Sequence, residues 1–374
     1  MTLVHLGEVN GDVVLALRNA AHDRLGADHD PGSLDAGALG PVGQLEGHLQ
    51  PRHRRNESIQ EQVCAGGAQI LGLGLPDLPI VGNRDRYLLG ALALCLLGWG
   101  AASTHRVLYP ARSPASSLSA FPATLVMGRD GRRFDVWRLE TAAPRGRVLV
   151  CHGFFANHDQ VLGVADGLRQ RGYETILFEL RGHGGRPGPC TLGVRESEDA
   201  ERVIQWAAEH DTHPLPLGAV GFSMRASVAC QLALRMPALG AIVADCLYSR
   251  LLPILARTIR QEYRLPAIPF AWLTWCGVAL GLRTRIGRVD PAVLAPRLRQ
   301  PLLAIQCGED RRVPLAQGEE YIRRWAGPVE RWIEPGVGHV GLFARNPSAY
   351  CDRLAAFFDR VLVVSSSREE RVES

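Results

Sequence analysis

Short apolar runs alternate with helical runs from about residue 121 to residue 363, and this order restricts the fold more than any other feature of the sequence. The two runs that come first flank an Asp-Gly turn and predict a hairpin. Strands that are separated by helices favour a mostly parallel sheet with helices on both faces, and therefore an α/β fold. The expected strands are Thr124 to Met127, Arg133 to Leu139, Val148 to Cys151, Thr175 to Leu180, Leu217 to Gly221, Ala241 to Ala244, Leu302 to Gln306 and Arg331 to Glu334.

Helical segments interrupt this alternation between residues 247 and 300. They include an apolar run with two tryptophans, Pro269 to Leu282. Loops at the carboxyl edge of an open α/β sheet form its binding site, and we expect this insertion to cover that edge as a small helical cap. The apolar run would line a substrate channel or close the core of the cap itself. The alternative is a second membrane-embedded segment.

The composition indicates a globular protein and excludes some functions. The chain has 374 residues, 46% of them hydrophobic, and a net charge of +4 that is dispersed along the sequence. A charge this small and this scattered does not predict nucleic-acid binding. The nine cysteines and twelve histidines show no metal-ligand spacing, so we expect buried structural thiols, no metal site and no cofactor.

Residues 1–85 do not have the pattern of a folded domain. They are rich in Gly, Ala, Leu, Asp and His and show neither a helical nor an alternating period. All 42 basic residues of the chain are arginines, a bias typical of GC-rich coding sequence, in which a spurious upstream frame can stay open. One hypothesis is that translation starts near Val81 from a non-ATG codon. The alternative is a low-order extension, and residues 364–374 are predicted to be a disordered tail.

A charge-free apolar segment, residues 87–103, follows the extension. As a helix it would be about 26 Å long, close to the roughly 30 Å of a membrane's hydrocarbon core. We expect a transmembrane helix or signal anchor, with a buried core helix as the alternative. Arg84 and Arg86 precede the segment and favour a cytoplasmic N-terminus, although Arg106 and Arg112 weaken this bias. The prediction is a single-pass membrane protein whose C-terminal domain is periplasmic or otherwise extracytoplasmic.

A serine lies where one of the expected strands meets a helix, in Gly221-Phe222-Ser223-Met224-Arg225. A sharp strand-to-helix turn lifts such a hydroxyl above the sheet and leaves the N–H of the next residue, Met224, free to bind a developing oxyanion. Ser223 is therefore the candidate nucleophile. An ordinary turn serine is the alternative.

An acid and a base follow this serine in the chain. Asp310 comes directly after the strand that ends at Gln306, and His339 lies in a glycine-bearing loop after Glu334. A serine nucleophile needs a base to take its proton and an acid to orient that base. The order Ser, Asp, His is the one found with this kind of turn. Glu309 and Asp245 are rivals for the acid.

Other polar residues near the expected strand ends are assigned no chemistry. His158 and His183 are expected to be loop residues. Glu196 and Asp199 lie in the first turns of a helix, where the helix dipole favours carboxylates.

Five motifs together resemble the α/β-hydrolase superfamily over roughly residues 120–363. They are His152-Gly153-Phe154, Leu180-Arg181-Gly182-His183-Gly184, Gly221-Phe222-Ser223-Met224, Asp310-x-x-Val313-Pro314 and Gly338-His339. More narrowly, the chain resembles bacterial membrane-anchored serine hydrolases of the lysophospholipase-like or prolyl-oligopeptidase-like kinds. The resemblance implies that the Phe154 N–H is the second oxyanion donor, beside that of Met224, and that His152 is structural.

Arg225 departs from the pattern of such turns. Glycine is usual two residues after the nucleophile, because the helix there packs tightly against the neighbouring strand. We expect the arginine side chain to point out of that contact or to distort it, so that Arg225→Gly keeps or raises activity.

The functional prediction is a serine hydrolase that cleaves a carboxylic ester, small or lipid-like, through an acyl-serine. The alternatives are a catalytically impaired homologue that acts as a binding protein, and a serine peptidase or amidase.

Overall fold

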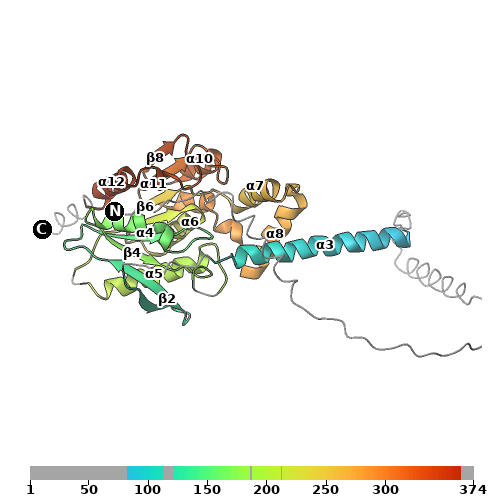
Figure 1. Cartoon of the computed structure of the whole chain (residues 1–374), viewed down its shortest axis with the longest axis horizontal. Coiled ribbons are helices and arrows are strands. Elements are labelled where there is room, and N and C mark those ends of the chain that lie inside the picture. Colours follow the sequence, from blue (N-terminus) through green and yellow to red (C-terminus); the bar gives the residue numbers. More distant parts are fainter. Residues whose placement is uncertain (1–81, 113–120, 186–187, 212, 364–374) are drawn as a thin grey trace, which may run out of the picture. The chain divides into compact units, whose positions relative to one another are not determined.

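The computed structural model describes residues 82–112, 121–185, 188–211 and 213–363. The predicted extension up to Val81, the hypothesis of a later start and the predicted C-terminal tail lie outside these residues. Figure 1 shows the arrangement of the described elements.

Eight strands form one sheet in the order β1-β2-β4-β3-β5-β6-β7-β8. The strands β1 and β2 form an antiparallel hairpin, and β2 pairs antiparallel with β4, while all other neighbours are parallel. The predicted mostly parallel sheet is confirmed, and every predicted strand is present. Their bounds are β1 Thr124–Met127, β2 Arg133–Leu139, β3 Arg147–Cys151, β4 Glu174–Phe178, β5 Leu217–Phe222, β6 Leu239–Asp245, β7 Leu302–Cys307 and β8 Val329–Glu334.

Alternation of side chains along the strands produces two hydrophobic cores, one on each face of the sheet. On β3, Val148 and Val150 belong to the core under α4 and α12, whereas Leu149 and Cys151 belong to the core under α5 and α6. The central strands are buried on both faces, as expected of parallel strands between two helical layers. The main helices are α3 Asn83–Leu108, α4 Asp159–Arg169, α5 Val194–Ala208, α6 Ala226–Arg235, α7 Leu251–Glu262, α8 Ala267–Leu282, α10 Leu315–Arg324 and α12 Pro347–Phe358, with shorter α9 Pro291–Leu294 and α11 Leu342–Arg345.

Helices α7 and α8, which we call the cap, follow β6 and precede β7 in the chain, and they lie outside the sheet (Figure 1). The apolar α8 packs against α7 and against the C-terminal part of α3. The Thr274 hydroxyl donates to Ser103 Oγ over 2.8 Å, and the rings of Trp99 and Phe270 meet edge to face at 5.2 Å. A β-carbon added at Gly277 would lie 1.9 Å from Thr104 Oγ1, so this glycine lets the two helices approach closely.

Helix α3 is longer than the predicted apolar segment, since it begins at Asn83 and ends at Leu108. Among the described residues it is the one helix long and apolar enough to cross a membrane. Its N-terminal part exposes large apolar side chains, among them Tyr87, Leu94 and Leu97.

A close backbone contact fixes the turn between β5 and α6. A β-carbon added at Gly221 would lie 2.4 Å from the Ala226 Cα and 2.8 Å from the Ala226 nitrogen. The two segments can therefore approach this closely only if residue 221 has no side chain. Between them, Ser223 adopts a left-handed backbone with φ of 53°, a strained conformation that the surrounding structure must hold.

We predict that Gly221→Ala destabilises the protein and distorts this turn. The added methyl overlaps backbone rather than a movable side chain, so the free energy of unfolding should fall by about 3 kcal/mol or more. Urea denaturation measures this change. Gly185→Ala is the matched control, because a β-carbon there meets nothing within 4 Å; equal stability of both variants would contradict the packing argument.

Candidate active site

Ser223, Asp310 and His339 lie together at the carboxyl edge of the sheet. The His339 Nε2 is 2.8 Å from Ser223 Oγ, and its Nδ1 is 2.6 Å from Asp310 Oδ2. The three residues follow β5, β7 and β8, and β7 and β8 are hydrogen-bonded neighbours in a parallel sheet, so both leave it at the same edge. The geometry matches a nucleophile, a base within hydrogen-bonding reach and a carboxylate that orients the base.

Backbone hydrogen bonds hold the Asp310 carboxylate in place. Its Oδ1 accepts from the N–H groups of Arg312 and Val313, both at 2.8 Å, which leaves Oδ2 for the imidazole. The loop of His339 is tied to the loop of Asp310, because the Glu309 N–H donates to the Val337 carbonyl at 2.9 Å. These contacts fix the acid and the base relative to each other before any ligand binds.

The two rival acids are placed elsewhere. Glu309 is exposed, next to Asp310 in the chain. Asp245 is buried and accepts a hydrogen bond of 2.8 Å from the Tyr350 hydroxyl. Burial is the largest influence on the Asp245 carboxyl and raises its pKa to about 6, although the bond from Tyr350 opposes that rise.

The two candidate oxyanion donors flank the serine. Phe154 follows β3, and Met224 is the residue after Ser223. Strands β3 and β5 pair in register, with Cys151 beside Gly221, so both N–H groups lie just beyond the same end of the sheet. Among the backbone hydrogen bonds of the described turns and loops, neither N–H donates to another protein group.

The Arg225 side chain points away from the strand into a buried pocket. The tight contact expected at this position falls on the next residue, Ala226, so the arginine neither meets the strand nor distorts the turn. It is fully buried, and its Nη1 donates to Glu196 Oε1 at 3.0 Å. Its Nη2 lies 3.1 Å from the imidazole of His183, and its guanidinium lies 5.8 Å from the centre of the Phe154 ring.

Glu196 is a buried ion-pair partner as well as a residue of the first turn of α5. It accepts hydrogen bonds from the N–H groups of Thr191 and Gly193, at 2.7 and 2.9 Å, and from the Thr191 hydroxyl. Burial would raise the pKa of its carboxyl, but Arg225 and the Thr191 bonds together hold it below the usual range. Helix-dipole reasoning alone missed this partner, which the cationic residue at position 225 could have suggested.

His183 and His158 lie in loops, as predicted, and both are buried; among the described residues neither forms a hydrogen bond with Ser223. Burial, followed by the nearby Arg225 charge, lowers the pKa of His183 to about 2, so this imidazole stays neutral beside the guanidinium.

His158 contacts an aromatic ring and a carboxylate. Its ring stacks on that of Trp137 with the ring centres 3.8 Å apart, and its Nδ1 lies 3.0 Å from Glu179 Oε2. Burial would raise the pKa of Glu179, but hydrogen bonds from His152 and His158 lower it to about 2. Asp199 forms a buried ion pair with Arg181, whose Nε donates to Asp199 Oδ2 over 2.6 Å.

Comparison with known proteins agrees with this architecture. A sequence model of the alpha/beta hydrolase fold matches residues 146–263. The resemblance to the α/β-hydrolase superfamily is thereby confirmed, and the chain has the α/β-hydrolase fold. The narrower likeness to membrane-anchored serine hydrolases stays a prediction.

The chain is similar to several proteins of known sequence or structure. It is 25% identical over 217 residues to YqkD, an uncharacterised protein of Bacillus subtilis, covering 57% of this chain and 71% of the relative. An uncharacterised protein of Mycobacterium tuberculosis is 28% identical over 241 residues, covering 62% of this chain and 79% of the relative. Among solved structures, an esterase of Pyrococcus furiosus superposes with a TM-score of 0.58 at 21% identity, covering 68% of this chain and 98% of its own. The α/β hydrolase GrgF of a Penicillium species superposes with a TM-score of 0.53 at 16% identity, covering 65% and 99%.

We predict that Glu196→Gln destabilises the protein strongly, because it leaves the buried Arg225 charge without a carboxylate. Removing one partner of a buried pair costs about 3–5 kcal/mol, whereas replacing both is often close to neutral. The double variant Glu196→Gln with Arg225→Met should therefore regain much of the lost stability. Urea denaturation of the unaltered protein, the single variants Glu196→Gln and Arg225→Met and the double variant tests this, and additive losses would contradict it.

Proposed function

We propose that this protein is a serine hydrolase that cleaves a carboxylic ester. The observation that carries the proposal is the continuous pair of contacts from Ser223 Oγ through the His339 imidazole to Asp310 Oδ2, at 2.8 and 2.6 Å. The α/β-hydrolase fold supports hydrolysis in general, and a fold neighbour is an esterase. The proposed reaction uses side chains and backbone N–H groups of the protein together with water.

In the proposed reaction, Ser223 Oγ attacks the ester carbonyl while His339 Nε2 takes its proton. Asp310 holds the imidazole through Nδ1 and stabilises the imidazolium that forms. The N–H groups of Phe154 and Met224 bind the oxygen of the tetrahedral intermediate. His339 then gives its proton to the departing alcohol, which leaves an acyl-serine. A water molecule, deprotonated by the same imidazole, attacks the acyl-serine and releases the acid and the free serine.

Arg225 is a positioning residue in this proposal. It follows the donor Met224 directly, and its guanidinium lies beneath the ring of Phe154. The ion pair with Glu196 therefore connects both donor segments to α5. A displacement of about 1 Å at such a site can lower the rate about a hundredfold. We accordingly expect Arg225→Gly to lower activity, in contrast to the expectation from sequence.

We also propose that α3 attaches the protein to a membrane. At 1.5 Å per residue, its 26 residues span about 39 Å. The part before Trp99, which lies ahead of the contacts with α8, spans only about 24 Å, which is less than the roughly 30 Å hydrocarbon core. Since the core is thicker than this free part, the membrane boundary would reach the α3–α8 contact.

The outer face of α8 suits such a boundary. Ile268 and Leu280 are 71% and 77% exposed, and Trp272 is half-exposed between them. Arg283 and Arg285 follow the helix and could face lipid phosphates, as tryptophan and arginine commonly do at interfaces. A cap held at the bilayer favours a lipid-like acyl ester as substrate. Arg84 and Arg86, in the first turn of α3, favour a periplasmic or extracytoplasmic position for the hydrolase domain.

The catalytic proposal is tested with a fluorophosphonate probe and a short nitrophenyl ester. Ser223→Ala should abolish labelling and lower turnover by roughly 10⁴ or more, because it removes the nucleophile. Ser348→Ala, which changes an exposed serine on α12, is the control and should behave like the unaltered protein. Labelling that persists in Ser223→Ala would refute the assignment, and an unreactive unaltered protein would favour the binding-protein alternative.

The membrane proposal is tested by flotation of the full chain with vesicles after washing in high salt. Leu92→Arg combined with Leu94→Arg should release the protein, because each arginine near the centre of a span costs about 2.5–3.5 kcal/mol on insertion scales. The control pair, Leu125→Arg with Met127→Arg, changes apolar side chains of β1 that are 56% and 50% exposed. Retention of the α3 variant on vesicles would count against α3 as the anchor.

A further inference from the structure

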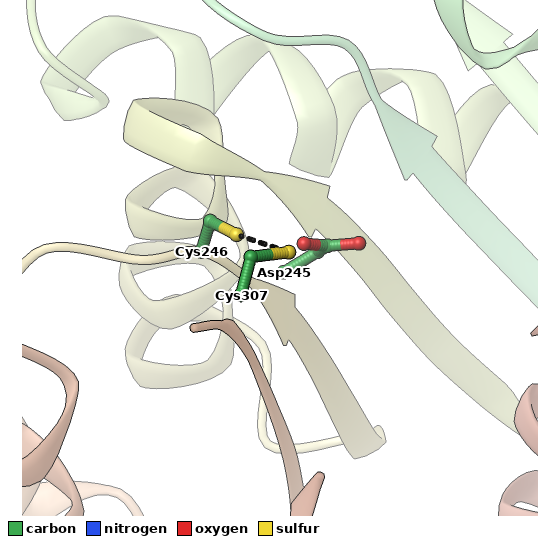
Figure 2. Close-up of side chains that lie close together, drawn as sticks. All are labelled: Asp245, Cys246 and Cys307. Atoms are coloured by element: carbon green, nitrogen blue, oxygen red, sulfur yellow. Dashed lines mark hydrogen bonds between the residues drawn. The ribbon is translucent and has the colours of Figure 1, made fainter. Parts of the chain in front are cut away.

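Two cysteines and an aspartate gather behind the His339 side of the active site. Asp245 ends β6, Cys246 follows it, and Cys307 ends the neighbouring strand β7. The two sulfur atoms are 3.5 Å apart, and one ligand atom from each of the three residues lies within 4.8 Å of the others. Figure 2 shows the sulfurs facing each other, with the Asp245 carboxyl beside Cys307.

This cluster has one donor atom that the protein leaves unused. Asp245 is fully buried, and its Oδ2 accepts from the Tyr350 hydroxyl. Among the described residues no N–H or O–H group donates to its Oδ1, although the carboxyl also accepts a weak hydrogen bond from the Cys246 thiol. Within the described residues, no arginine or histidine forms an ion pair with Asp245. A buried carboxylate oxygen without a partner is costly, and a bound cation would compensate it.

The spacing and chemistry of the three donors suit a thiophilic divalent cation. Zinc binds thiolate sulfur at about 2.3 Å in tetrahedral sites, which places two sulfurs about 3.8 Å apart. The Cys246–Cys307 separation of 3.5 Å therefore needs only a small adjustment. Tyr350 would orient the carboxylate from outside, as hydrogen-bond donors to metal ligands commonly do.

We propose that Asp245, Cys246 and Cys307 form a binding site for a thiophilic divalent cation such as Zn²⁺ or Cd²⁺. On binding, the cation replaces the protons of both thiols, which leave to solvent, and the two thiolates balance its charge. The spacing of cysteines along the sequence does not predict this site, because the two residues are 61 positions apart and meet only when β6 and β7 pair.

The site would also affect the active centre. Cys246 belongs to a second cluster with Asp310 and His339, whose ligand atoms lie within 4.8 Å of one another. Binding would change the distribution of charge beside the imidazole that must accept the Ser223 proton, because the Cys246 thiol becomes a cation-bound thiolate while the net charge of the site stays the same. This consequence rests on the proposed function, whereas binding itself does not.

Binding is tested directly by titrating Cd²⁺ into the reduced, metal-free full chain and following the near-ultraviolet absorption of cadmium–thiolate bonds. The background protein carries Ser in place of Cys95 and Cys276, which are exposed, and of Cys64, which lies outside the described residues. We expect saturation at one equivalent and a rise in melting temperature with Cd²⁺ concentration. Absence of a saturable signal would overturn the proposal.

Variants then identify the ligands. Cys246→Ser and Cys307→Ser should each abolish the one-equivalent signal, and Tyr350→Phe should weaken binding by about 10- to 100-fold. Cys230→Ser and Cys351→Ser, buried thiols elsewhere, should leave it unchanged. If a variant unfolds, the melting-temperature rise of the background protein still tests the site.

His339→Gln separates the two clusters. The signal should persist in this variant, because His339 is not a proposed ligand. Loss of the signal in His339→Gln together with its retention in Cys307→Ser would overturn the assignment in favour of the second cluster. Inhibition of ester hydrolysis by Zn²⁺, reversed by a chelator, is measured separately, and its absence alongside intact binding would refute only the effect on catalysis.

Discussion

The left-handed backbone at Ser223 is the constraint on which the site depends. A residue with a β-carbon avoids this conformation unless its neighbours enforce it, and here the crossing of Gly221 with Ala226 does so. The same crossing aims the hydroxyl toward His339 and starts α6 directly after the turn. Other non-glycine residues with positive φ lie near the ends of neighbouring strands, at Phe155, Cys246 and Val340. The other non-glycine residues with positive φ, Leu192, Arg264 and Arg283, lie elsewhere, so part of the backbone strain, but not all of it, lies at the edge of the sheet that carries the polar side chains.

Buried ion pairs and backbone hydrogen bonds hold the candidate catalytic residues at this edge of the sheet. Arg225 occupies a position where a side chain was expected to be harmful, and its charge is matched by Glu196, which in turn is held by Thr191 and Gly193. His183 stays neutral beside the guanidinium because burial and that charge both oppose its protonation. The carboxylate of Asp310 and the loop of His339 are fixed by backbone hydrogen bonds. The candidate catalytic groups are therefore held by interactions that do not depend on a ligand.

Much of the fold follows from local patterns in the sequence. Every expected strand is present, and the central ones are continuous apolar segments because strands buried on both faces need them. The contacts of Ser223, Asp310 and His339 agree with the predicted constellation, since parallel strands bring their carboxyl ends to one edge. The Arg225–Glu196 pair and the Asp245–Cys246–Cys307 cluster were not predicted. Both join residues that are distant in sequence, and their geometry is set by how α5, β6 and β7 pack rather than by any local period.

The contact between Gly221 and Ala226 has a consequence for recognising similar proteins. The steric demand at this turn is for glycine at residue 221, two places before the serine, whereas the place two after the serine holds a large side chain whose charge is balanced by a buried glutamate. A search pattern that insists on glycine at that second place would overlook chains of this kind.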